Sequence, residues 1–144
     1  MSIEGHELQD AVARFVRAFG LHQPDRTPCG RPIPVSEAHA LGELAREDGA
    51  LRQNELAHRL RLEKSSTSRL VGQLANRGWL ERTPAPGDGR GVLLRLTPAG
   101  RKAADELAAA RNARFSAVLS RVPEQQRDDV LHALKILTEA IDED

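Results

Sequence analysis

The chain has 144 residues, of which 40% are hydrophobic and 29% charged, a composition typical of one folded domain with a core of its own. The sequence has no apolar run of about 18 residues, and Met1 to Asp10 carries acids, so we expect neither a membrane span nor a secretory signal. The single cysteine, Cys29, excludes an internal disulfide and agrees with a cytoplasmic address. Aromatic residues make up 3%, too few for the stacking platforms of single-strand-binding proteins.

The formal net charge of +0 hides two opposite charges. Residues 52–102 contain 11 Lys or Arg against 4 Asp or Glu, a net charge of +7, and the rest of the chain carries −7. A basic segment of this kind creates the field that attracts nucleic-acid phosphates. The competing interpretation is that exposed helices simply carry solvated charges.

The N-terminal part of the chain predicts two helices joined by a stiff arm. An apolar stripe predicts a helix over residues 7–19, which Gly20 ends. Four prolines fall within residues 23–34 and restrain the backbone, so we expect a loop or a partly extended arm there. Ser36 is the expected N-cap of a second helix that continues to Glu47.

The middle of the chain has the order of a winged helix-turn-helix: two short helices, a strand, a Gly/Pro loop, a second strand and a new helix. Thr97 and Pro98 begin the new helix, because proline is favoured at the first helical position after a capping threonine. The expected fold class is therefore mainly α with a small β-hairpin wing. The predicted elements are helices over 53–60 and 64–77, strands over 79–83 and 92–96, and helices over 98–120 and 124–141.

The second helix of the pair begins with small hydroxyl side chains, which would let it lie close to base edges and phosphates. Its free N–H groups and its dipole favour a phosphate, and Arg69 or Gln73 can reach a guanine or an adenine edge. Helix capping is the alternative explanation for the hydroxyl residues. The predicted DNA contacts are Gln53, Lys64, Ser65, Ser66, Ser68, Arg69, Gln73 and Arg90.

The predicted wing has Arg90 at its tip between two glycines. A thin loop with one arginine suits the minor groove, where a narrow A·T-rich segment attracts guanidinium. Asp88 either pairs with a nearby arginine, Arg77 or Arg90, and supports the wing, or forms the turn through its own side chain.

Together these residues resemble the MarR family of bacterial winged helix-turn-helix transcriptional regulators. The Asp-x-Arg wing followed by Leu-Thr-x-x-Gly is fairly specific, whereas a helix-turn-helix alone is not. The motifs that carry the resemblance are Gln53-Asn54-Glu55-Leu56-Ala57, Lys64-Ser65-Ser66-Thr67-Ser68-Arg69-Leu70-Val71, Arg77-Gly78-Trp79-Leu80-Glu81-Arg82, Asp88-Gly89-Arg90 and Leu94-Arg95-Leu96-Thr97-Pro98-Ala99-Gly100.

The resemblance implies a single domain over residues 1–144, with a winged-helix core over about 35–100 and dimerisation helices over about 1–22 and 101–144. It implies a homodimer that binds a palindromic operator in double-stranded DNA. It also implies that the second helix of the pair enters the major groove, that Arg90 contacts the minor groove, and that a small molecule or an oxidant releases the DNA.

Two features depart from the family pattern. Thr67 occupies a position that the family usually fills with a small apolar residue, which threonine can also fill. The proline-rich arm over residues 23–34 is longer and stiffer than the usual link between the first two helices. Since the family's effector pockets lie near this region, the resemblance does not transfer a ligand.

Cys29 and His39 are the candidates for a redox or effector role. Arg26 and Arg31 lie near Cys29 and would favour the thiolate of a redox switch, whereas an ordinary loop thiol is the alternative. His22, Cys29, Glu37 and His39 are possible metal ligands, but their spacing matches no recognised zinc pattern, so we expect no metal and no cofactor.

The phenylalanines at positions 15, 19 and 115 either line a pocket for an aromatic or lipophilic effector or pack in the core. For the chain as a whole, the leading interpretation is a sequence-specific DNA-binding repressor. No metal-ligand set, phosphate loop or nucleophile elbow occurs in the sequence, so we do not expect an enzyme. A winged-helix module that binds protein instead of DNA is the alternative, but it gives no reason for the basic segment or for Arg90 between glycines.

Overall fold

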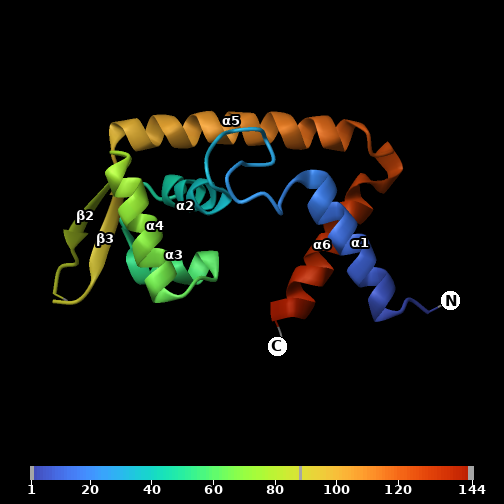
Figure 1. Ribbon diagram of the computed structural model, residues 1–144, viewed down its shortest axis with the longest axis horizontal. Coiled ribbons are helices and arrows are strands. Elements are labelled where there is room, and N and C mark those ends of the chain that lie inside the picture. Colours follow the sequence, from blue (N-terminus) through green and yellow to red (C-terminus); the bar gives the residue numbers. More distant parts are fainter. Residues whose placement is uncertain (1, 88, 143–144) are drawn as a thin grey trace.

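Helices make up most of the chain that the computed structural model describes, residues 2–87 and 89–142 (Figure 1). The order of elements confirms the predicted winged helix-turn-helix between flanking helices. No helix in the described ranges combines the length and the apolar character needed to cross a membrane. The elements are α1 (Gly5–Phe19), α2 (Val35–Ala45), β1 (Leu51–Arg52), α3 (Gln53–Leu60), α4 (Lys64–Asn76), β2 (Leu80–Pro84), β3 (Val92–Leu96), α5 (Pro98–Ser120), the 3-10 helix η1 (Glu124–Gln126) and α6 (Arg127–Asp142).

Several predicted element ends are wrong by one or two residues: α1 begins at Gly5 and not at residue 7, and α2 ends at Ala45 and not at Glu47. Two other ends have a clear local cause. The N-cap of α2 is Pro34 and not Ser36, because Pro34 has an extended backbone and its carbonyl already accepts the Ala38 N–H at 3.1 Å. Strand β2 starts at Leu80 and not at Trp79, because the Trp79 N–H still closes the end of α4 by donating to the Leu74 carbonyl at 3.2 Å. The last helix also begins with a 3-10 turn before α6.

A short strand that the sequence analysis did not predict turns the hairpin into a sheet. The sheet is antiparallel with the order β1-β3-β2. Leu51 of β1 lies opposite Leu94, and Leu80 of β2 lies opposite Leu96. Since β1 has two residues, it has no readable periodicity and exists only through its pairing with β3.

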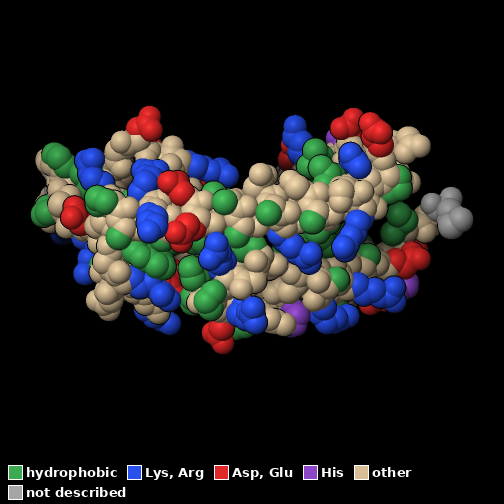
Figure 2. Space-filling view, turned by 90° about the horizontal axis from the view of Figure 1, so that it is seen from above, with side chains coloured by type: hydrophobic (Ala, Val, Ile, Leu, Met, Phe, Trp, Pro, Cys, Tyr) green, Lys and Arg blue, Asp and Glu red, His purple; other side chains and the backbone are tan. Residues whose placement is uncertain are grey.

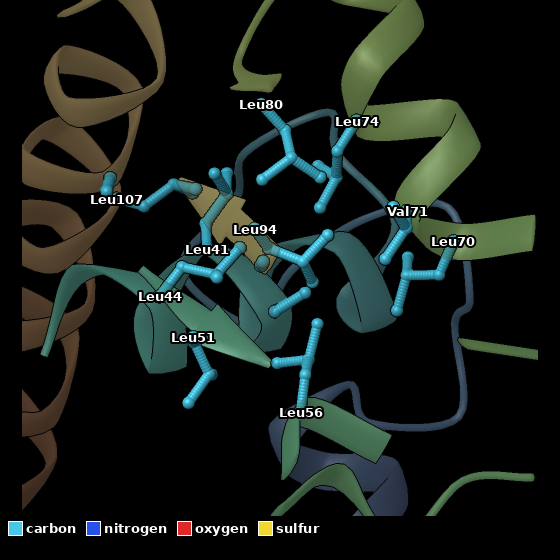
Figure 3. Packing of buried hydrophobic residues seen from close by; sticks show 13 residues of the cluster. Leu41, Leu44, Leu51, Leu56, Leu70, Val71, Leu74, Leu80, Leu94 and Leu107 are labelled. Carbon is cyan, nitrogen blue, oxygen red and sulfur yellow. The ribbon is translucent and has the colours of Figure 1, made fainter. Parts of the chain in front are cut away.

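The core lies within the winged helix, where side chains from α2, α3, α4, the sheet and the first half of α5 converge (Figure 3). Thr67 is also fully buried, and its hydroxyl donates to the Glu63 carbonyl at 2.9 Å, so the polar group at this apolar position is satisfied. The largest fully buried aliphatic side chains are Leu41, Leu56, Leu74, Leu94 and Val71.

The junction between the sheet and α5 holds the wing against the rest of the fold. The Thr97 hydroxyl accepts the Gly100 N–H at 3.0 Å and donates to the Gly78 carbonyl at 2.6 Å. Pro98 follows at the first helical position, which confirms the predicted helix start. A Cβ atom on Gly100 would overlap the carbonyl oxygen of Trp79 and lie 2.8 Å from its carbonyl carbon. Glycine is therefore required where the start of α5 crosses the start of β2.

The helices α1 and α6 lie at the end of α5 that is remote from the wing (Figure 1). Apolar side chains at this end remain at the surface, some of them visible from above in Figure 2. Exposed apolar side chains on amphipathic helices favour an interaction with a partner that buries them. The exposed large apolar residues of α1, the end of α5 and α6 are Leu8, Val12, Phe15, Phe115, Leu119, Val130, Leu131, Leu134, Ile136 and Ile141.

Candidate nucleic-acid interface

Helix α4 separates a buried face from an exposed polar face. Leu70, Val71 and Leu74 point into the core together with Thr67. The predicted contacts Lys64, Ser65, Ser68, Arg69 and Gln73 are exposed, Ser66 is half-buried, and Gln53 is half-buried at the start of α3. The predicted recognition helix therefore presents its polar side chains to the surface, as a major-groove reader must.

The first turn of α4 has no side-chain cap, because Glu63 at the N-cap accepts no hydrogen bond through its carboxylate. The backbone N–H groups of this turn are therefore not satisfied by a side chain at the N-cap, which suits an approaching phosphate oxygen. Lys64 and Ser65 are exposed in the same turn. The alternative explanation was that serines cap α4. The residue at the N-cap is Glu63 and not a serine, so this explanation does not apply there.

The wing is the hairpin of β2 and β3, and its tip lies on the same side of the molecule as the N-terminal end of α4 (Figure 1). The Ala85 N–H donates to the Gly91 carbonyl at 2.9 Å and closes the loop, and Gly87 has the positive φ of 73° that the turn requires. Arg90 is exposed near the tip. Asp88, the other predicted wing residue, lies outside the described residues.

Arg77 supports the base of the wing through a buried carboxylate of α2. Its Nε donates to Glu37 Oε1 at 2.6 Å and its Nη2 to Oε2 at 3.3 Å. The guanidinium carbon also lies 5.0 Å from the centre of the Trp79 ring. Glu37 is 3% exposed, so this bidentate pair fixes the end of α4 and the start of β2 on α2. The sequence did not indicate Glu37 as the partner, because the two residues lie far apart in the chain.

Several arginines of the basic segment are bound to groups of the protein itself. Arg59 lies 2.7 Å from a Glu47 oxygen and 3.2 Å from a Glu55 oxygen, and these two hydrogen bonds raise the pKa of Arg59. Arg61 pairs with Asp142, and Arg101 donates to the Ala45 carbonyl at 2.9 Å, at the end of α2. The charge offered to DNA is therefore concentrated on fewer residues than the sequence count suggests.

A small pocket lies between α2 of the winged helix, the arm over residues 23–34, the end of α1 and α5. Its volume is about 100 Å³, and Cys29 and His39, the two predicted sensing residues, both line it. Phe19 of α1 and Phe115 of α5 contribute apolar walls, with ring centres 5.0 Å apart, whereas Phe15 stacks on Phe19 at 5.6 Å. The other lining residues are Leu21, Thr27, Pro28, Val35, Ala38, Leu107, Arg111 and Arg114.

The arm over residues 23–34 forms the wall of this pocket that faces α5, and it consists of successive turns, as its prolines predict. The Cys29 sulfur lies 2.8 Å from the Thr27 hydroxyl oxygen and is half-buried. Arg26 donates to the Gly30 carbonyl at 3.2 Å. Within residues 2–87 and 89–142, no group of three potential metal ligands lies close enough to hold an ion.

An exposed polar helix, a core that holds it and a Gly-rich basic hairpin beside it define a winged helix-turn-helix protein. Residues 32–91 match the model of the MarR family. An uncharacterized HTH-type transcriptional regulator of Mycobacterium leprae is 34% identical over 140 residues, which cover 95% of this chain and 92% of that protein. The chain belongs to the MarR family of DNA-binding transcriptional regulators.

Solved structures share this fold over nearly the whole chain. A probable transcriptional regulator from Pseudomonas aeruginosa has a TM-score of 0.71 and 26% identity, covering 92% of this chain and 95% of its own. S. aureus MepR in complex with DNA has a TM-score of 0.70 and 20% identity, covering 94% and 91%. Bordetella bronchiseptica BpsR, whose DNA binding is regulated by 6-hydroxynicotinic acid, has a TM-score of 0.71 and 21% identity, covering 95% and 94%.

Proposed function

We propose that this protein is a repressor that binds a palindromic operator in double-stranded DNA as a homodimer and is released by a chemical signal. The observation that carries the proposal is the exposed polar face of α4 beside the Arg90 wing on one rigid winged helix. In this arrangement α4 reads the major groove and Arg90 reaches the adjacent minor groove. A regulator of this kind works on the chromosome, in the cytoplasm.

The exposed apolar surfaces of α1 and α6 support the homodimer. Leu131 is 67% exposed and Ile141 64%, and a stable single chain seldom leaves several large apolar side chains of one helix this exposed without a partner. A second copy of the chain supplies an equivalent apolar surface, and a two-fold interface then places one α4 in each half-site. A dimer that binds two half-sites at once has a much higher affinity than one winged helix alone, and its two-fold symmetry requires a palindromic operator.

The first prediction concerns Arg90. We expect Arg90→Ala to weaken operator binding by about 1–3 kcal/mol, because the substitution removes a groove contact, and to leave the fold unchanged. The measurement is a titration of the protein with an operator duplex, selected from random sequences, and with an unrelated duplex at several salt concentrations. Wild-type affinity should fall steeply with salt, since the protein releases counterions from several phosphates.

Arg46→Ala is the matched control, because Arg46 is also an exposed arginine but lies at the C-cap of α2, outside the predicted DNA contacts and the proposed dimer helices. This variant should bind the operator with wild-type affinity. Salt-insensitive binding by the wild type, or equal affinities of Arg90→Ala and Arg46→Ala, would contradict the role of the wing. Failure of any duplex to bind, together with capture of a protein ligand, would favour the interaction module.

The pocket between the winged helix and the terminal helices is the proposed site of the signal. Its walls are mostly apolar, which suits an aromatic ring, and Arg111 supplies a cation for a carboxylate. At about 100 Å³ it is smaller than the cavity of roughly 150 Å³ that holds benzene in an engineered protein core. An aromatic acid must therefore push the arm away from α5, and this displacement would move the winged helix that binds DNA.

The second prediction uses 6-hydroxynicotinic acid, the regulator of BpsR, as the probe of this site. We expect it to weaken operator binding by a factor of roughly 5–150, the usual range of coupling between two sites. Arg111→Gln should remove this response because the carboxylate loses its cation. Arg121→Gln removes an exposed arginine outside the pocket and should respond like the wild type.

An oxidant is the other signal considered, through Cys29 in the same pocket wall. The same operator titration with hydrogen peroxide separates the two signals. An oxidant switch requires that peroxide weakens binding by the wild type and not by Cys29→Ser. Identical titrations of these two proteins would leave the aromatic acid as the proposed signal.

A further inference from the structure

Helix α3 ends in a way that differs from α1 and α4. Arg61, at its C-terminus, has φ 56° and ψ 41°, the left-handed conformation that glycine adopts most easily. Gly20 and Gly78 occupy this conformation after α1 and α4. Within residues 2–87 and 89–142, Arg61 is the one residue other than glycine with a positive φ. An arginine is therefore kept at a position where its backbone is strained.

The backbone of this helix end does not need an arginine side chain. The Arg61 N–H donates to the His58 carbonyl at 3.1 Å, and the Leu62 N–H donates to the Ala57 carbonyl at 3.0 Å. Glycine would form the same two hydrogen bonds without strain. What arginine adds at this position is its guanidinium, which pairs with Asp142 Oδ1 at 2.5 Å.

This ion pair joins two parts of the molecule that otherwise lie apart. Arg61 belongs to the turn that leads into α4, and Asp142 is the last residue of α6. Among the described elements, only η1, which directly precedes α6 in the chain, makes more than isolated backbone contacts with it. An open cavity of about 930 Å³ lies beside the pair, between the end of α6 and the helices α2 and α3. Figure 1 shows α6 running back from the far end of α5 toward the winged helix.

The length of α5 makes the position of the winged helix sensitive to this contact. Its 23 residues span about 35 Å, so a rotation of about 10° at the end near α6 moves the winged helix by about 6 Å. This displacement corresponds to about two base pairs, since successive base pairs are about 3.4 Å apart. Helix α5 connects the winged helix to α6 at one end, and the pair between Arg61 and Asp142 connects the other end of α6 back to the winged helix. This second connection opposes the rotation.

We propose that Arg61 is a positioning residue for operator recognition: through its pair with Asp142 it fixes α4 relative to α6, and so fixes the distance between the two α4 helices of the dimer. This inference rests on the proposed function, in which α6 belongs to the dimer interface. Both side chains are about half exposed, 59% and 49%, so the pair adds little to folding stability. Its effect is on geometry.

The test measures how affinity depends on the separation of the two half-sites. Operator duplexes are prepared in which the separation is changed by one and two base pairs in each direction. Wild-type affinity should fall at least about tenfold at two base pairs, because the second winged helix no longer reaches its half-site. Asp142→Asn and Arg61→Gly should each lose about threefold or less over the same series. The double variant Arg61→Asp/Asp142→Arg, which restores the pair with reversed charges, should recover the steep dependence.

Two controls separate positioning from folding and from charge. Glu106→Gln removes an exposed acid from α5, away from the pair and from α6, and should keep the wild-type dependence on separation. Thermal unfolding should be unchanged in Asp142→Asn and equal or higher in Arg61→Gly, where the left-handed strain is relieved. Steep dependence in Asp142→Asn and Arg61→Gly, as in the wild type, would overturn this inference alone. A wild type that binds single and paired half-sites equally well would overturn the proposed dimeric function and the inference with it.

Discussion

Gly100→Ala should lower the free energy of unfolding by about 3 kcal/mol or more, at the upper end of what overpacking costs. The added methyl group would overlap the backbone carbonyl of Trp79, which cannot rotate away like a flexible side chain. The same carbonyl accepts the Thr97 N–H at 3.0 Å, so moving it would also break the junction between β2 and α5. A domain of this size is stable by only about 5–15 kcal/mol, so the variant would lose a large share of its stability.

Gly72→Ala is the matched control, because it adds the same methyl group to a helix where no atom lies within 4 Å of the new Cβ. We expect a gain of about 0.5–1 kcal/mol, since alanine restricts the unfolded chain and favours helix. Both variants are measured by urea unfolding at one protein concentration, because a dimer's stability depends on concentration. Equal urea midpoints for Gly100→Ala and the wild type would show that the backbone at the junction accommodates the methyl group, which contradicts this prediction.

The fold could be predicted from the sequence wherever a local signal ends an element. Capping threonine and proline fix the start of α5 at Pro98, and the predicted span to Ser120 is confirmed. The start of α2 was misplaced because a proline with extended backbone can serve as N-cap without any side-chain hydrogen bond. The two residues of β1 could not be found at all, since a strand of that length is defined only by its neighbour β3.

The exposed positions of the candidate interface could be predicted from the sequence, whereas the ion pairs that hold its elements in place could not. The exposed positions on α4 follow from helical spacing, because Thr67, Leu70 and Leu74 define the buried face. The partners of the arginines could not be predicted, because they come from distant elements. Arg77 binds Glu37 of α2, and Arg61 binds Asp142 of α6. The count of +7 therefore overstated the charge available to DNA, since acids outside the segment neutralise part of it.

Arg77→Met should destabilise the protein by about 2–4 kcal/mol, because it leaves the carboxylate of Glu37 buried and unpaired. Glu37 is 3% exposed, whereas the Arg77 side chain is 39% exposed, so solvent screening keeps the cost below that of a fully buried pair. Methionine retains an unbranched side chain that can contact the Trp79 ring, so the loss reports mainly on the charge. Arg82→Met removes an exposed arginine of β2 and should change stability by less than about 0.5 kcal/mol.

Neutralising the carboxylate as well distinguishes an unpaired charge from lost packing. In the double variant Glu37→Gln/Arg77→Met, a neutral amide replaces the buried charge, so at least about 1 kcal/mol of the loss should return. Urea unfolding of the wild type, both single variants and the double variant measures this coupling. Additive losses would mean that the pair is not coupled. Because Arg77 lies between the end of α4 and the wing, Arg77→Met should also bind operator more weakly than the wild type at temperatures where it remains folded. We therefore expect stability and operator binding to depend on the same contact, which joins the end of α4 and the start of the wing to α2.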